Sequence, residues 1–166
     1  MNIQVESKYD ADEVEADLEL IQLVTFSIGE EEFGVNILQV QEIIRTMEIT
    51  KVPRAPVFVE GVINLRGKVI PIVDMRSRFG LRSKEHDKYT RIIVIEIDMI
   101  IVGFVVDAVS EVLRLPANAV QPPPPVVAGM DADYIDGVGK LDERLLILLD
   151  LNSLLDSDEK EALTGV

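Results

Sequence analysis

The chain has 166 residues, 48% of them hydrophobic, with no cysteine, one histidine and a formal net charge of −14. This charge argues against nucleic-acid binding and direct membrane contact, because phosphate backbones and anionic lipids attract clustered lysine and arginine. The missing cysteines exclude disulfides, thiol catalysis and cysteine-based zinc sites. We see no signal peptide or membrane-spanning run, so we expect a cytoplasmic protein that is long enough to bury a core.

Residues 1–19 are the most acidic part of the chain, with seven acidic residues and one lysine. This composition predicts a disordered tail. We expect an apolar strand over 20–28 and, after a short turn, a returning strand over 33–35. Asn36 can cap a short helical turn. Residues 41–45 then alternate polar and apolar side chains, which predicts a half-buried strand, and on a sheet edge such a strand could dock a helix or strand of a partner.

The stretch 61–79, GVINLRGKVIPIVDMRSRF, is the most regular part of the chain. Its two β-branched runs, joined by a polar turn, predict a hairpin. Pro71 lacks a backbone N–H, so its strand is expected to be an edge there or to carry a bulge. Gly67 is either a turn residue with positive φ or a point of close approach for a partner. Arg66 is either a solvated charge or an anchor for an interaction.

The same pattern occurs twice in the sequence. A shift of 76 positions places 61–79 on 137–155, with five identical residues, and a shift of 69 places 33–45 on 102–114. The second copy carries seven extra residues in the proline-rich segment 123–136. One β unit used twice is the simplest interpretation. We expect the two halves to pack together along an apolar seam, because each half is too short to be more than marginally stable by itself.

These observations predict a mainly β body over residues 20–166. Each half has about five short strands, a number that suits a small β-barrel because closure removes exposed edges. We expect the first barrel over about 20–81 and the second over about 91–155, with a charged connection at 82–90. We expect a C-terminal helix within 156–166, with Ser157 as the cap before Asp158–Leu163.

The sequence offers little for catalysis. His86 lies in the charged connection and is interpreted as an exposed loop residue, without a nucleophile and acid to complete a triad. Asp74 and Asp150 occupy equivalent positions in the two copies, where each is expected to cap a short helical turn near Ser77 or Ser153. The alternative is a small-ligand or enzyme domain that uses Asp74 or Asp150. We predict a non-enzymatic protein with no catalytic residues, no cofactor and no metal site.

Four segments, in order and with matching spacing, resemble the CheW family of bacterial chemotaxis coupling proteins: FGVNILQVQEIIR, GVINLRGKVIPIVDMRSRFG, VGFVVDAVSEVL and DGVGKLDERLLILLDL. The resemblance implies a mainly β fold of two intertwined five-stranded SH3-like β-barrels with short helices. It implies an adaptor that couples the histidine kinase CheA to methyl-accepting chemoreceptors in membrane-associated arrays. An adaptor of a non-motility chemosensory pathway is the alternative.

The resemblance also implies two sets of contact residues. In the family, a helix of the chemoreceptor tip lies in the groove between the barrels, and a regulatory domain of the kinase pairs end to end with an adaptor barrel. The receptor-side residues are Val40, Glu42, Ile43, Asn64, Leu65, Arg66 and Gly67. The kinase-side residues are Val105, Val106, Asp107, Val109 and Glu111. The acidic tail and the prolines at 122–125 depart from the family pattern.

Overall fold

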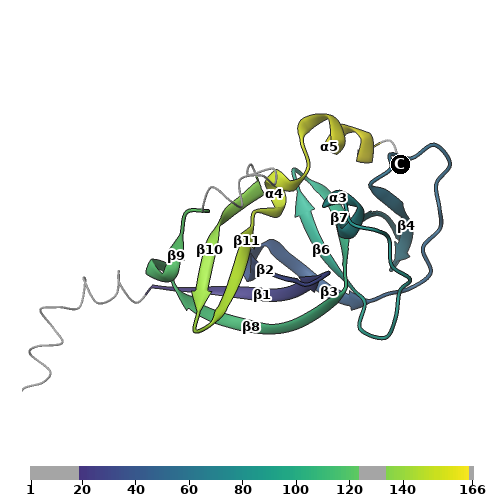
Figure 1. Ribbon diagram of the computed structural model, residues 1–166. Coiled ribbons are helices and arrows are strands. Elements are labelled where there is room, and N and C mark those ends of the chain that lie inside the picture. Colours follow the sequence, from purple (N-terminus) through teal and green to yellow (C-terminus); the bar gives the residue numbers. More distant parts are fainter. Residues whose placement is uncertain (1–18, 124–133, 165–166) are drawn as a thin grey trace, which may run out of the picture.

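The computed structural model describes residues 19–123 and 134–164 (Figure 1). The predicted acidic tail, apart from Glu19, and most of the proline-rich segment lie outside these residues. The strands are β1 (Leu20–Ile28), β2 (Glu31–Asn36), β3 (Val40–Arg45), β4 (Val59–Leu65), β5 (Lys68–Asp74), β6 (Arg91–Ile97), β7 (Ile100–Val106), β8 (Ala108–Pro116), β9 (Val120–Gln121), β10 (Ile135–Leu141) and β11 (Arg144–Leu149). The helices are η1 (Ile37–Gln39), α3 (Met75–Arg78), η2 (Ala117–Ala119), α4 (Leu151–Leu154) and α5 (Ser157–Thr164).

The described strands form two mixed sheets, which confirms the mainly β class. One sheet has six strands in the order β8-β1-β2-β11-β10-β9, and the other has five in the order β3-β6-β7-β5-β4. The six-stranded sheet exceeds the expected five because the two-residue strand β9 pairs with β10 at its edge. Each sheet takes strands from both halves of the sequence. Hairpin β1–β2 joins the later strands β8 to β11, and hairpin β6–β7 joins the earlier strands β3 to β5. The expected bounds 20–81 and 91–155 therefore mark the sequence repeat, whereas the sheets exchange hairpins between the repeats.

A parallel strand pair marks the point of exchange in each sheet. In the six-stranded sheet, β2 pairs with β11 at Phe33–Gly34. In the five-stranded sheet, β7 pairs with β5 at Gly103–Val105. Gly34 and Gly103 are equivalent under the shift of 69, so the parallel strand pair forms at the same position of the repeat in both sheets.

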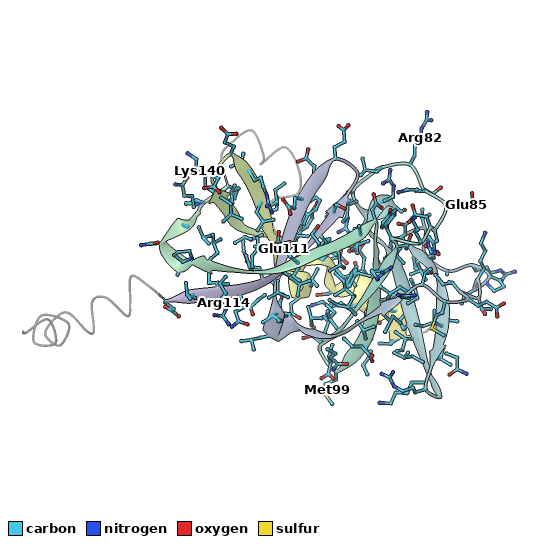
Figure 2. The ribbon with its side chains drawn as sticks, turned by 90° about the horizontal axis from the view of Figure 1, so that it is seen from below. Arg82, Glu85, Met99, Glu111, Arg114 and Lys140 are labelled. Carbon is cyan, nitrogen blue, oxygen red and sulfur yellow. The ribbon has the colours of Figure 1, made fainter. Side chains whose placement is uncertain are left out.

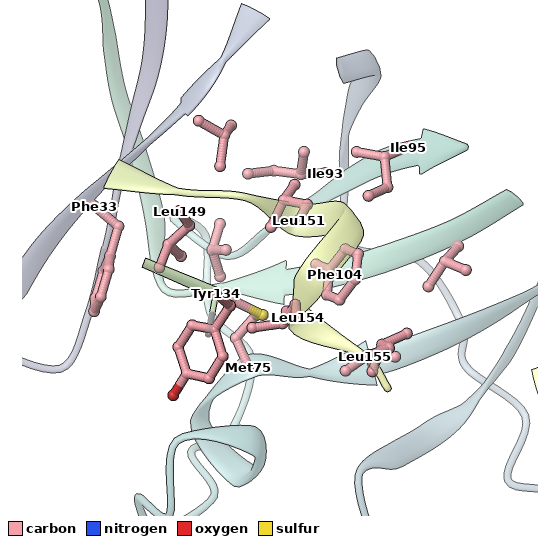
Figure 3. Packing of buried hydrophobic residues seen from close by; sticks show 14 of the residues in the cluster. Phe33, Met75, Ile93, Ile95, Phe104, Tyr134, Leu149, Leu151, Leu154 and Leu155 are labelled. Carbon is pink, nitrogen blue, oxygen red and sulfur yellow. The ribbon is translucent and has the colours of Figure 1, made fainter. Parts of the chain in front are cut away.

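The core lies mainly between the two sheets (Figure 3). Strand β6 shows how the sequence produces it. Ile93, Ile95 and Ile97 belong to this central cluster, whereas Ile92 and Val94 belong to a smaller cluster inside the five-stranded sheet. A strand that is buried on both faces has a continuous apolar run, as RIIVIEI does. The predicted apolar seam between the halves is confirmed by this cluster.

The predicted caps of the short helical turns are confirmed. The Asp74 carboxylate accepts the Arg76 backbone N–H at 3.1 Å, at the start of α3. The Asp150 carboxylate accepts the Asn152 N–H at 3.0 Å and the Ser153 hydroxyl at 2.8 Å, at the start of α4. Asn36 accepts the Leu38 N–H at 2.9 Å before η1. Asp74 and Asp150 thus have the same folding role in the two repeats.

The C-terminal helix is confirmed as α5, but its predicted cap is wrong. Asp156, not Ser157, accepts the Glu159 N–H at 2.8 Å, and Glu159 accepts the Asp156 N–H in return at 2.9 Å. This reciprocal pair satisfies two backbone donors, which a serine one position later cannot do with Glu159. Leu163 on α5 is buried, so the helix closes over the central cluster.

Pro71 lies where its strand has a free side, as predicted. Opposite Pro71, Val62 makes both of its backbone hydrogen bonds with Thr50, at 2.8 and 2.9 Å. In the described residues, β5 pairs with β7 only from Ile72 onward. The missing N–H of Pro71 therefore faces away from β4 and disrupts no bond of the sheet.

Candidate protein-binding surface

An ion pair joins the two outer strands of the five-stranded sheet. Glu42 on β3 pairs with Arg66 in the β4–β5 turn, although β3 and β4 occupy opposite ends of the strand order. The sheet therefore curls until its edges meet. The side chains are 32% and 68% exposed, so the pair contributes at most about 1 kcal/mol. Its main effect is to hold one basic and one acidic group side by side at the surface.

A hollow of about 140 Å³ opens beside this ion pair. Leu65, Ile70 and Val94 give it an apolar lining, and Lys68 adds a second basic group to its rim. The hollow is smaller than the roughly 300–1,000 Å³ typical of small-molecule sites. A single side chain from a protein partner suits it better than a cofactor does.

The turn that carries Arg66 has a specific backbone geometry. Arg66 and Gly67 both have positive φ, at 52° and 86°, which is the pattern of a type I′ hairpin turn. The Asn64 side chain accepts the Gly67 N–H at 2.9 Å and stabilises the turn. In the second hairpin, Asp142 has φ of 49°, whereas Glu143 is not among the described non-glycine residues with positive φ. Gly67 is thus a turn glycine, and the two tips differ in shape as well as charge.

The structure places the seven receptor-side residues on the two edge strands that the Glu42–Arg66 pair connects, with three on β3 and four at the end of β4 and in the β4–β5 turn. We call this set the β3–hairpin face; its residues are Val40, Glu42, Ile43, Asn64, Leu65, Arg66 and Gly67. Ile43 is 37% exposed and gives the face an accessible apolar side chain. Val40 packs partly against the central cluster between the sheets, whereas Leu65 packs partly against the smaller cluster inside the five-stranded sheet.

The five kinase-side residues do not form a common exposed surface. Val105 and Val106 are 6% and 1% exposed, so their side chains belong to the core. Asp107 accepts the Gly29 N–H at 2.8 Å and pairs with Arg76, which ties the β1–β2 turn to α3. Val109 packs partly against the central cluster.

Glu111 is the exposed member of the kinase-side set, on the edge strand β8 (Figure 2). Its carboxylate lies 3.7 Å from Arg144, and its backbone bonds the buried Thr25 hydroxyl at 3.1 and 3.2 Å. These bonds occur where the register between β1 and β8 shifts.

Sequence reasoning missed an acidic residue at an equivalent bulge in each repeat. Glu60 interrupts the register of β4 and Asp136 that of β10, each directly before a glycine of the repeat. Burial is the main cause that raises the pKa of both carboxyls, and Asp74 or Asp150 nearby raises it further. The sequence signal that could have revealed these two residues is an acidic residue directly before a glycine at equivalent positions of both repeats.

The interpretation of His86 as an exposed loop residue is wrong. Its side chain is 25% exposed and lies 3.2 Å from Glu60 and 3.0 Å from the Thr46 hydroxyl. The connection folds back over β4, which the charged sequence of residues 82–90 did not indicate.

Nothing in the arrangement supports catalysis by Asp74 or Asp150. A groove of about 530 Å³ contains Asp74 and Glu60, but Asp74 is engaged as a helix cap. Within residues 19–123 and 134–164, no three histidine, cysteine or acidic residues are arranged to hold a metal ion. In the same part of the chain, no helix combines the length and the apolar character that a bilayer crossing requires.

Comparison with known proteins identifies the family. Residues 22–159 match the CheW-like domain. The chain is 39% identical to chemotaxis protein CheW of Klebsiella aerogenes over 145 residues, which cover 87% of both chains. It is 36% identical to chemotaxis protein CheW of Treponema pallidum over 152 residues, 89% of both chains. The crystal structure of the scaffolding protein TtCheW from Thermoanaerobacter tengcongensis is similar, with a TM-score of 0.76, 40% identity and coverage of 84% of this chain and 90% of that one. The chain therefore belongs to the CheW family, the non-enzymatic scaffolding proteins of bacterial chemotaxis.

Proposed function

We propose that this scaffold couples a CheA-type histidine kinase to the cytoplasmic tip of chemoreceptors, and that the receptor binds the β3–hairpin face. The observation that supports this most is the Glu42–Arg66 pair, which assembles residues from two distant parts of the chain on one exposed edge. Binding there recruits the protein from the cytoplasm to the membrane-associated receptor array.

The chemistry of this face suits a helix with one apolar stripe. An apolar side chain of the helix can enter the hollow beside Leu65, and another can contact Ile43. Glu42 and Arg66 present opposite charges next to these apolar contacts. Helices that bind in this way use apolar anchors at spacings of three and four residues, with polar groups that fix the register.

The kinase-side proposal is narrower than the sequence implied. Glu111 on the edge strand β8 is the residue that can touch a partner directly. Val106 and Val109 belong to or pack against the central cluster, Val105 lies inside the five-stranded sheet, and Asp107 fixes the β1–β2 turn. We place the contact with the kinase regulatory domain at the β8 edge, away from the β3–hairpin face.

A binding assay with both partners tests the proposal. The full chain is mixed with a chemoreceptor cytoplasmic fragment or with the kinase regulatory domain, and binding is measured by calorimetry. Arg66→Glu is expected to weaken receptor binding at least tenfold and to leave kinase binding unchanged, because interface arginines are frequent hot spots. Arg82→Glu is the matched control, since Arg82 is an exposed arginine on the connection 82–90 and does not belong to the β3–hairpin face. Binding of the wild type to neither partner would contradict the proposed function.

A further inference from the structure

The only histidine of the chain joins three segments of the five-stranded sheet. Its Nδ1 atom lies 3.0 Å from the hydroxyl of Thr46, which directly follows β3. Its Nε2 atom lies 3.2 Å from the carboxylate of Glu60, at the bulge of β4. His86 itself belongs to the connection between α3 and β6. We call this arrangement the Thr46–His86–Glu60 clasp, and it closes the β3–β4 connection at its base.

The position of His86 is fixed by the turn that follows it. The Asp87 carboxylate accepts the backbone N–H groups of Tyr89 at 2.8 Å and Thr90 at 3.2 Å. The Thr90 hydroxyl accepts the Asp87 N–H at 2.9 Å, and Thr90 is buried. The imidazole is therefore presented to Thr46 and Glu60 by a turn that leads directly into β6.

The charged groups around the clasp come from several elements. Burial raises the pKa of the Glu60 carboxyl, and the neighbouring His86 opposes this effect. Asp74, which precedes α3, raises that pKa further, whereas Lys51 on the β3–β4 connection lowers it.

The charged neighbours of His86 on its own connection either form an ion pair with each other or are exposed to solvent. Lys84 and Asp87 pair with each other at 3.4 Å, and Glu85 and Lys88 are exposed. Figure 2 shows Arg82 and Glu85 at the outer end of the molecule. Glu60 is thus the carboxylate in direct contact with the imidazole among the described residues.

We propose that the clasp is a charge-sensitive device that fixes the end of β3 to the base of β4. A protonated imidazole donates one N–H to the Thr46 oxygen and the other to the Glu60 carboxylate. A neutral imidazole keeps one N–H, so the bond to Thr46 depends on the hydroxyl donating instead, and the ion pair is lost. When Glu60 takes up a proton at lower pH, its negative charge is lost as well. The clasp therefore makes the most bonds when the imidazole is protonated and the Glu60 carboxyl is ionised.

This inference rests on the proposed function of the β3–hairpin face. In the described sheet, β3 has a strand partner, β6, on one side only; on its other side it is connected to β4 by the Glu42–Arg66 pair and, beyond Thr46, by the Thr50–Val62 bridge. Ile43 lies three residues before Thr46, about 10 Å along the strand. His86 is therefore a positioning residue for this face, and its charge links receptor binding to pH.

Amide hydrogen exchange of the full chain tests the clasp without any receptor. Exchange of residues 46–58 is compared between wild type and His86→Gln at the same pH, first at pH 6 and then at pH 8.5. At pH 6 we expect the variant to exchange about threefold to tenfold faster, as loss of a partly exposed, charge-assisted bond predicts. At pH 8.5 we expect a ratio below about two, because a neutral imidazole has no ion pair that the variant could lose.

Variants of neighbouring residues separate the clasp from a general effect on the loop. Thr46→Ser keeps the hydroxyl and is expected to match wild type, whereas Thr46→Val is expected to exchange faster. Lys84→Gln breaks the Lys84–Asp87 pair in the same connection and should leave the 46–58 segment unchanged. Equal exchange rates in wild type and His86→Gln at pH 6 would overturn the proposal. So would a variant-to-wild-type rate ratio that is the same at both pH values.

Receptor binding is measured as a second arm of the test. The affinity of wild type for a receptor cytoplasmic fragment should fall by at least twofold from pH 6 to pH 8.5, relative to His86→Gln. If the fragment binds both proteins with the same pH dependence, the link between the clasp and receptor binding is refuted. If the fragment binds neither protein, the proposed function fails, while the exchange experiment still decides whether the clasp exists.

Discussion

Substitution of Gly61 by alanine should destabilise the protein strongly. A Cβ atom at this position would lie 2.3 Å from the Thr50 carbonyl oxygen and 2.7 Å from Cγ2 of Ile49. The same carbonyl oxygen accepts the Val62 N–H at 2.8 Å, so the clash can be relieved only by separating residue 50 from β4. Overpacking of this kind costs about 1–3 kcal/mol, and each lost hydrogen bond about 1 kcal/mol. We therefore expect a loss of about 2–4 kcal/mol in the free energy of unfolding.

Urea denaturation of the full chain measures this loss, and Gly67→Ala is the matched control. A Cβ atom at Gly67 would meet nothing within 4 Å, so only the positive φ opposes alanine there. That conformation costs about 1–2 kcal/mol for a non-glycine residue. Gly137→Ala should resemble Gly61→Ala, since its Cβ atom would lie 2.7 Å from the Gln121 carbonyl oxygen. If Gly61→Ala costs no more than Gly67→Ala, the steric reason given for the repeated glycine is refuted.

Three further predictions concern single side chains. Phe104→Ala should lower the free energy of unfolding by about 3–5 kcal/mol, measured by urea denaturation, because Phe104 is fully buried between the sheets. Arg66→Glu should lower that free energy by no more than about 1 kcal/mol, since it removes an exposed ion pair with Glu42; a larger loss would mean that Arg66 is structural. Asp136→Asn should be slightly more stable than wild type at pH 7. The pKa of Asp136 is raised in the fold, so wild type loses stability as pH rises through that pKa, and the difference between the two proteins should vanish below pH 3.8.

The sequence predicted features that depend on local pattern. Alternating and continuous apolar runs indicated the strands, and the repeated Asp74 and Asp150 indicated two capped turns that the structure confirms. Pro71 marked a free strand side because proline lacks the N–H that a sheet needs. In each of these cases, the residue and its immediate neighbours determine the conformation.

The exchange of hairpins between the repeats could not be predicted in this way. An apolar strand such as β6 looks the same whichever sheet it joins, and the parallel pairs β2–β11 and β5–β7 connect distant parts of the chain. Val105 and Val106 differ, because the continuous apolar run IIVGFVV favours their burial, and only the family resemblance implied that they contact a partner. The contacts of His86 with Thr46 and Glu60 depend on how a charged connection folds back, which its composition does not encode.

The central claim is that a chemoreceptor helix binds the β3–hairpin face. The most direct test is a titration of the isotope-labelled full chain with a receptor cytoplasmic fragment, followed by NMR chemical shifts. The account predicts that the largest shift changes lie at Glu42, Ile43, Leu65 and Arg66, with little change at Glu111. Shift changes that centre on β8 or on the β10–β11 hairpin, with the β3–hairpin face unchanged, would contradict it.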